Sequence, residues 1–162
     1  MLLPPSTEDL RFLQMAIDLA TEHMRAHDGG PFGAVIARGE KVVARGWNQV
    51  TSANDPTAHA EIMAIRAAAQ AAGSFKLAGC VLYTSCEPCP MCLGAAYWAR
   101  LDRIVFAATR ADAGAAGFQD ERLYEEVARP PHLRKLPMQE GLREKAARLF
   151  SEWRAMPDKT PY

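Results

Sequence analysis

Two short segments hold the residues best suited to chemistry: His59-Ala60-Glu61 and Pro88-Cys89-Pro90-Met91-Cys92. One imidazole and two thiolates make a three-ligand zinc site whose fourth position stays open for water. Cys92 follows Cys89 by about one helical turn, so both sulfurs can face the same point. We therefore predict that His59, Cys89 and Cys92 bind Zn²⁺, with each ligand set at the start of a helix.

Glu61 follows the predicted imidazole ligand by two residues, so it cannot share a helical face with His59. It can still reach a metal-bound water from the side. A carboxylate there can take a proton from water and pass it to a leaving group, which is general acid–base catalysis. We predict that Glu61 is the catalytic residue.

Two other uses of the cysteines are open. Cys86 could be a fourth ligand, which would make a closed structural Cys₃His site, but Glu61 would then have no task. Disulfides among Cys80, Cys86, Cys89 and Cys92 are disfavoured because the N-terminus lacks an export signal. We expect Cys80 and Cys86 to be buried, reduced thiols.

The elements that must position these residues alternate along the chain, which predicts an α/β fold with helices on both faces of a mixed sheet. Ser6 should cap a first helix, Asp55-Pro56 should begin the helix that holds His59, and residues 48–54 and 112–118 should be loops. Strands are expected at 32–37, 41–47, 81–84 and 103–108, and further helices at 89–100, 121–128 and 143–156.

Length and charge limit the function. The 162 residues suit a single domain, and 49% hydrophobic residues can form a core. Nineteen basic and nineteen acidic residues give a net charge of +0, which argues against nucleic acid as a partner. No apolar run reaches the length of about 20 residues that a membrane helix needs. We expect a cytoplasmic protein with no membrane partner.

Together, His-x-Glu and Pro-Cys-x-x-Cys match the signature of zinc deaminases. The sequence resembles the cytidine deaminase-like zinc hydrolases and, within them, the short bacterial guanine deaminases. The segments Asn54–Glu61 and Tyr83–Ala95 support this resemblance most strongly. Further support comes from Gly29–Ile36, Tyr97–Arg100, Ala116–Gly117–Phe118 with Asp120, and the terminal Tyr162. Asn54–Glu61 is shared with tRNA adenosine deaminases and does not separate the two groups.

The resemblance implies a three-layer α/β/α fold with a mixed five-stranded sheet over residues 1–162. It implies a homodimer in which a C-terminal segment, about 143–162, is swapped between subunits. The expected reaction, a step of purine metabolism, converts guanine to xanthine and ammonia by attack of a metal-bound hydroxide. The purine base would meet Asn48, the backbone N–H of Ala60, Asp120, Tyr162, Phe32 and Trp98.

These residues also have purely structural interpretations. Asn48 could be a turn residue, Asp120 a helix cap, and Phe32 and Trp98 core residues. Three other functions are open: a tRNA-specific adenosine deaminase, a deaminase of guanosine or another nucleoside, and a zinc-stabilised binding module without catalysis. Salt-dependent RNA binding would favour the first of these, and ammonia release would exclude the last.

Overall fold

The computed structural model describes residues 4–161, apart from the side chain of Asp120. The chain forms two compact units, with the boundary between Tyr124 and Glu125. The first unit contains a sheet in the order β2-β1-β3-β4. The strands are β1 (Gly33–Arg38), β2 (Lys41–Trp47), β3 (Val81–Cys86) and β4 (Arg103–Ala108). β1 is antiparallel to both β2 and β3, whereas β3 and β4 are parallel.

The sheet is mixed, as predicted, but it has four strands where five were expected. Directly after β4, Thr109 and Asp112 form a capping box and start the helix α5 (Arg110–Ala115). This reciprocal cap satisfies backbone donors at a helix start, so the chain leaves the sheet at that point. No further strand follows in the part of the chain that the structure describes.

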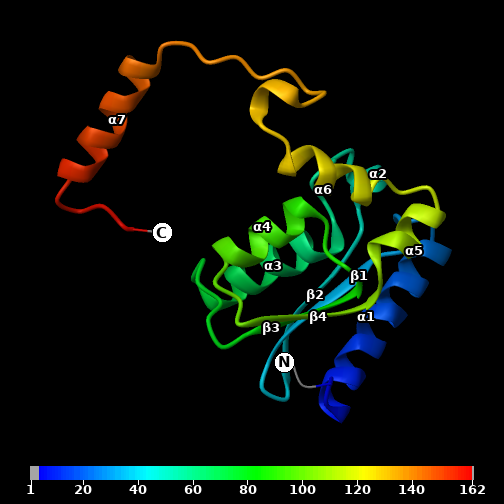
Figure 1. The fold of residues 1–162 in the computed structure, drawn as a ribbon. Coiled ribbons are helices and arrows are strands. Elements are labelled where there is room, and N and C mark those ends of the chain that lie inside the picture. The colour runs from blue at the N-terminus through cyan, green and yellow to red at the C-terminus, as the bar shows by residue number, and fades with distance from the viewer. Residues whose placement is uncertain (1–3, 162) are drawn as a thin grey trace. The chain divides into compact units, whose positions relative to one another are not determined.

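Helices cover both faces of this sheet, which gives the predicted three layers. α1 (Thr7–Arg25) packs on one face, and α3 (Ala60–Ala72) and α4 (Pro90–Trp98) cover the other (Figure 1). Side chains alternate along β1 accordingly: Val35 and Ala37 join the core beneath α1, and Ala34 and Ile36 join the core beneath α3.

α3 lies unusually close to β2. This close packing positions the N-terminal end of α3, where the candidate site begins. A Cβ at Gly46 would be 2.3 Å from the carbonyl oxygen of Ala60 and 2.5 Å from the backbone nitrogen of Ala64. Only glycine leaves room for this approach. The alanines of α3 facing the sheet, Ala60, Ala64 and Ala68, are fully buried.

An ionic network ties the start of α1 to β3 and β4. Ser6 and Asp9 form the predicted cap, now seen as a capping box. The buried Asp9 carboxylate also accepts hydrogen bonds from the Arg103 guanidinium, at 2.6 and 3.1 Å, and from the Tyr83 hydroxyl at 2.9 Å. The pKa of Asp9 is held well below its usual range, chiefly by Arg103. Burial and the contact with Asp9 raise the pKa of Tyr83 to about 12.

Three local predictions were wrong. α3 begins at Ala60, because Asp55 closes a turn by accepting the Thr57 N–H at 2.8 Å and does not cap the helix. Two segments that were expected to be loops contain helical residues, which belong to α2 (Val50–Ala53) and α5.

α6 (Asp120–Ala128) crosses the boundary between the two units.

The second unit contains the end of α6, a short 3₁₀ helix (Pro131–Leu133) and α7 (Arg143–Ala155). None of the residues of α7 is buried, and its large apolar side chains Leu149, Phe150 and Trp153 are exposed. Across the described chain, every helix is too short or too polar to cross a membrane.

Candidate active site

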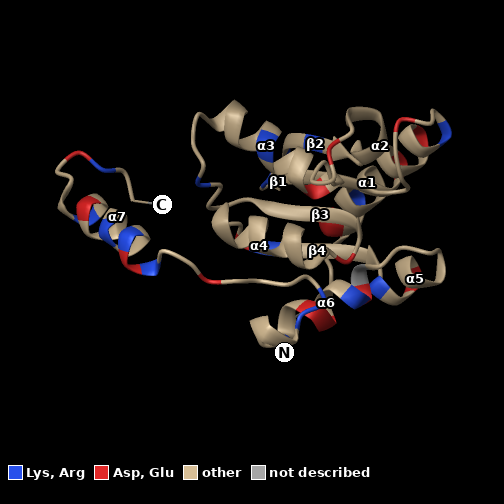
Figure 2. Ribbon diagram, turned by 90° about the horizontal axis from the view of Figure 1, so that it is seen from above, with Lys and Arg blue, Asp and Glu red and all other residues tan. Residues whose placement is uncertain are grey.

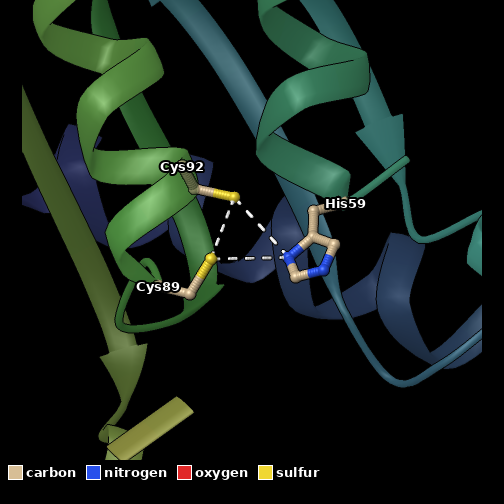
Figure 3. A group of neighbouring side chains, drawn as sticks. All are labelled: His59, Cys89 and Cys92. Carbon is tan, nitrogen blue, oxygen red and sulfur yellow. Dashed lines mark hydrogen bonds between the residues drawn. The ribbon is translucent and has the colours of Figure 1, made fainter. Parts of the chain in front are cut away.

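Two helix starts bring the predicted metal ligands together (Figure 3). His59 is the N-cap of α3, and Cys89 is the N-cap of α4 with Pro90 as its first helical residue. Both caps have extended backbone conformations, and Cys92 lies in the first turn of α4. The positive ends of both helix dipoles therefore lie beside the group, where they stabilise thiolates.

The three ligand atoms form a nearly equilateral triangle. The Nδ1 of His59 is 3.7 Å from the Sγ of Cys89 and 3.6 Å from the Sγ of Cys92, and the sulfurs are 3.6 Å apart. Zinc bonds of about 2.3 Å to sulfur and about 2.0 Å to nitrogen, spanning tetrahedral angles, place such atoms about 3.5–3.8 Å apart. The triangle therefore fits three corners of a tetrahedral zinc site.

The two thiols are coupled. A hydrogen bond with Cys92 is the largest influence that lowers the pKa of Cys89, to about 4, with His59 acting in the same direction. The same hydrogen bond with Cys89, together with burial, raises the pKa of Cys92. Zinc binds cysteine as the thiolate, so metal binding would release the proton that the pair holds.

Cys86 is separate from this group. Its thiol is buried and donates to the carbonyl oxygen of Thr109 at 3.6 Å, and all four cysteines are free. Among the described residues, the metal-ligand group consists of His59, Cys89 and Cys92. This argues against the closed Cys₃His site and leaves one coordination position for water or substrate.

Glu61 lies in the first turn of α3, two residues after the imidazole, and only 6% of it is exposed. Burial is the main cause that raises its pKa, to about 7. A carboxyl group with such a pKa can both accept and release a proton near neutral pH, which suits general acid–base catalysis.

A pocket of about 330 Å³ opens beside these residues, which is within the usual size range for small-molecule sites. His59, Glu61 and Cys89 line it, together with Phe32 and Asn48 from the predicted substrate contacts. The side-chain oxygen of Asn48 accepts the N–H groups of Gly30 and Val50, at 3.2 and 3.3 Å. Asn48 thus shapes the loop around the pocket.

Of the four other predicted contacts, the structure describes Ala60, Trp98 and the backbone of Asp120. Ala60, whose backbone N–H is the predicted contact, is the buried first residue of α3. Trp98 ends α4, is 63% exposed and lies outside the pocket lining. The backbone of Asp120 starts α6, but its side chain and the whole of Tyr162 lie outside the described part of the chain.

The pocket also contains residues that received no role from the sequence. Phe118 meets the Phe32 ring edge-to-face, with centroids 4.8 Å apart, and Gln119 and Leu123 line the same side. Glu87 lines the pocket as well, in the loop near Ser85 to Glu87 that the resemblance places beside the reacting centre. Ala116-Gly117-Phe118 is one of the segments that support the family resemblance, but no spacing rule links it to Phe32.

Comparison with known proteins places this geometry in a family. Residues 6–108 match the family described as the cytidine and deoxycytidylate deaminase zinc-binding region. The chain is 47% identical to guanine deaminase of Bacillus subtilis (strain 168), over 93% of this chain and 97% of that protein. It is 38% identical to a tRNA-specific adenosine deaminase of Buchnera aphidicola subsp. Schizaphis graminum, over 66% and 70% of the two chains.

The X-ray structure of guanine deaminase from Bacillus subtilis superimposes with a TM-score of 0.91 at 46% identity, covering 94% of this chain and 98% of that one. The residues matched by the family include the described ligands His59, Cys89 and Cys92 and the carboxyl group of Glu61. The chain belongs to the cytidine and deoxycytidylate deaminase zinc-binding family.

Proposed function

We propose that the chain catalyses the zinc-dependent hydrolysis of guanine to xanthine and ammonia. The observation that carries this proposal is the His59–Cys89–Cys92 triangle at a pocket that Glu61 also lines, in a chain similar to guanine deaminase along nearly its whole length. His59, Cys89 and Cys92 would hold the metal. When bound there, zinc supplies the Lewis acidity that lets water act as a nucleophile near neutral pH.

Glu61 moves the protons. Hydrolysis removes a proton from water and delivers protons to the base, and the buried Glu61, with a pKa of about 7, suits both tasks. It takes the proton from the attacking water and gives it first to the ring nitrogen beside C2. It then takes the second proton of that water, now the hydroxyl on C2, and gives it to the exocyclic amine. The bond between C2 and the amine breaks, ammonia leaves, and the oxygen remains on C2 as the new carbonyl oxygen of xanthine.

The pocket residues would orient the purine. Phe32 contributes an apolar wall, and the oxygen of Asn48 is already used by two backbone N–H groups. Since both lone pairs are engaged, the NH₂ of Asn48 would donate to an acceptor atom of the base. By resemblance, Asp120 would accept from an N–H of the base, and the Ala60 N–H, Trp98 and Tyr162 would complete the site.

The exposed apolar side chains of α7 support a homodimer. Phe150 is 75% exposed, and an amphipathic helix without a core of its own gains stability when a partner covers its apolar face. We propose that residues 143–162 are swapped between subunits, so that Tyr162 covers the partner's pocket. We also propose a cytoplasmic role in purine metabolism.

A nucleic-acid partner is not part of this proposal. Acidic residues are interleaved with the basic residues of α7 (Figure 2), and the whole chain has a net charge of +0. A protein that tracks phosphates normally carries an excess of basic residues.

The test is ammonia release from the zinc-loaded protein with five substrates in parallel: guanine, guanosine, cytosine, cytidine and an adenosine-containing tRNA hairpin. Preference for guanine is expected. Preference for guanosine would change the substrate to the nucleoside. Turnover of the hairpin alone would contradict the guanine assignment and support a tRNA adenosine deaminase, whereas no release from any substrate would contradict a deaminase.

A further inference from the structure

A tyrosine hydroxyl connects α6 to the loop that holds the metal ligands. Tyr124 lies in α6, and its hydroxyl donates a hydrogen bond of 2.6 Å to the carbonyl oxygen of Pro88. Pro88 is buried and directly precedes Cys89, the N-cap of α4. The donor from α6 is therefore one residue away from a zinc ligand.

The Tyr124 ring is held on a second side. The guanidinium of Arg110 lies over it, 4.7 Å from the ring centroid. The backbone N–H of Arg110 in turn donates to the Glu87 carboxylate at 3.0 Å, and the N–H of Glu87 donates to the carbonyl of Ala108 at 2.9 Å. The Glu87–Pro88 segment is thus joined both to the start of α5 and to α6.

The same helix region forms one side of the pocket. Phe118 and Gln119 precede α6, and Leu123 lies within it next to Tyr124. Phe118 also contacts Phe32 across the pocket. A shift of α6 relative to Pro88 would therefore move these three side chains relative to the metal ligands.

We propose that Tyr124 is a positioning residue, whose hydrogen bond to Pro88 holds the α6 side of the pocket in register with the metal ligands. It touches neither substrate nor metal. We expect Tyr124 to affect substrate binding, because the side chains on the α6 side of the pocket would contact the base. The metal ligands belong to the starts of α3 and α4 instead. The identity of the substrate rests on the proposed guanine deaminase function, but the mechanical coupling of α6 to the Pro88 loop does not.

The first test compares Tyr124→Phe with Tyr97→Phe, a matched control whose ring is 73% exposed. Tyr124→Phe keeps the ring and removes only the donor, so the fold and one bound zinc per chain are expected to remain. KM for guanine should rise about 5-fold, the size expected for one lost neutral hydrogen bond, with a smaller change in kcat. Tyr97→Phe should match the wild type.

The second test needs no substrate. Amide hydrogen exchange in residues 113–123 should be faster in Tyr124→Phe than in the wild type, while exchange in β1 and β2 stays the same. Unchanged exchange and unchanged KM would overturn the proposal. So would loss of zinc with normal exchange in 113–123, because Tyr124 would then serve the metal loop alone. If the wild type does not act on guanine, the proposed function fails, and the exchange comparison still decides the positioning role.

Discussion

At the scale of residues, the metal ligands could be predicted because Cys89-x-x-Cys92 is a local pattern. His59-x-Glu61 supplies the third ligand and a carboxyl group for proton transfer. The structure places the three ligand atoms within bonding range of one ion. Phe118, Gln119 and Leu123 could not be predicted as pocket residues. Their position depends on how the segment after β4 folds back, and no local spacing reports such a contact.

Glu61→Gln should retain zinc and lose activity. The amide cannot exchange a proton, so kcat should fall by about 10²–10⁴, the usual contribution of general acid–base catalysis. Ammonia release and metal content by mass spectrometry measure the two effects. Glu22→Gln, on an exposed position of α1, is the matched control. Turnover at the wild-type rate in Glu61→Gln would remove Glu61 from its role.

The two cysteines Cys86 and Cys89 should respond differently to substitution by serine. Cys89→Ser removes a ligand of the triangle and should lower bound zinc well below one ion per chain. Cys86→Ser should keep the zinc, because Cys86 bonds to Thr109 and not to the ligand group. Equal zinc loss in both variants would support the closed Cys₃His site.

At the scale of elements, α1 shows what sequence can and cannot predict. Its start followed from Ser6, a local capping signal that the structure confirms. The hydrogen bond between Asp9 and Arg103 joins residues 94 positions apart, so no local sequence pattern could predict it. The start of α3 was misplaced for a related reason: Asp55-Pro56 has the composition of a helix start, but the Asp55 side chain closes a turn.

Asp9→Asn should destabilise the protein by about 2 kcal/mol at neutral pH, since it removes a charge-assisted pair from a buried site. Arg103 holds the folded-state pKa of Asp9 below its unfolded value of about 3.9. The stabilisation is therefore present above pH 4 and disappears as the pH falls through the folded-state pKa.

Thermal unfolding of the wild type, Asp9→Asn and the exposed control Asp18→Asn between pH 2 and pH 7 measures this effect. The difference in unfolding temperature between the wild type and Asp9→Asn should be constant above pH 5 and should become smaller below pH 4. A difference that stays constant down to pH 2 would contradict an ionised Asp9 as its source.

At the scale of the whole molecule, hydrophobic alternation predicted the mixed sheet and its covering helices, because buried strands and amphipathic helices leave periodic patterns. The expected number of five strands came from family resemblance, whereas the sheet has four and the helix α5 follows β4. The exposure of the apolar side chains of α7 could likewise not be predicted from the local sequence, because it depends on how the whole chain folds.

Mixing two defective variants should restore activity if the C-terminal segment acts on the partner. A chain lacking Tyr162 keeps Glu61, and a Glu61→Gln chain keeps the tail. Hybrid dimers would contain one complete site, and random mixing would recover about a quarter of the wild-type activity per chain. Ammonia release after refolding the mixture measures this. Activity no greater than the sum of the separate variants would contradict the swap.

The most direct test of the central claim is the amount of xanthine and ammonia formed from guanine before zinc removal, after chelation and after zinc is restored. Our account predicts equal amounts of both products, loss of turnover when zinc is removed, and recovery when one zinc per chain is returned to the site of His59, Cys89 and Cys92. Full turnover by zinc-free protein, or zinc-loaded protein that leaves guanine intact, would contradict it.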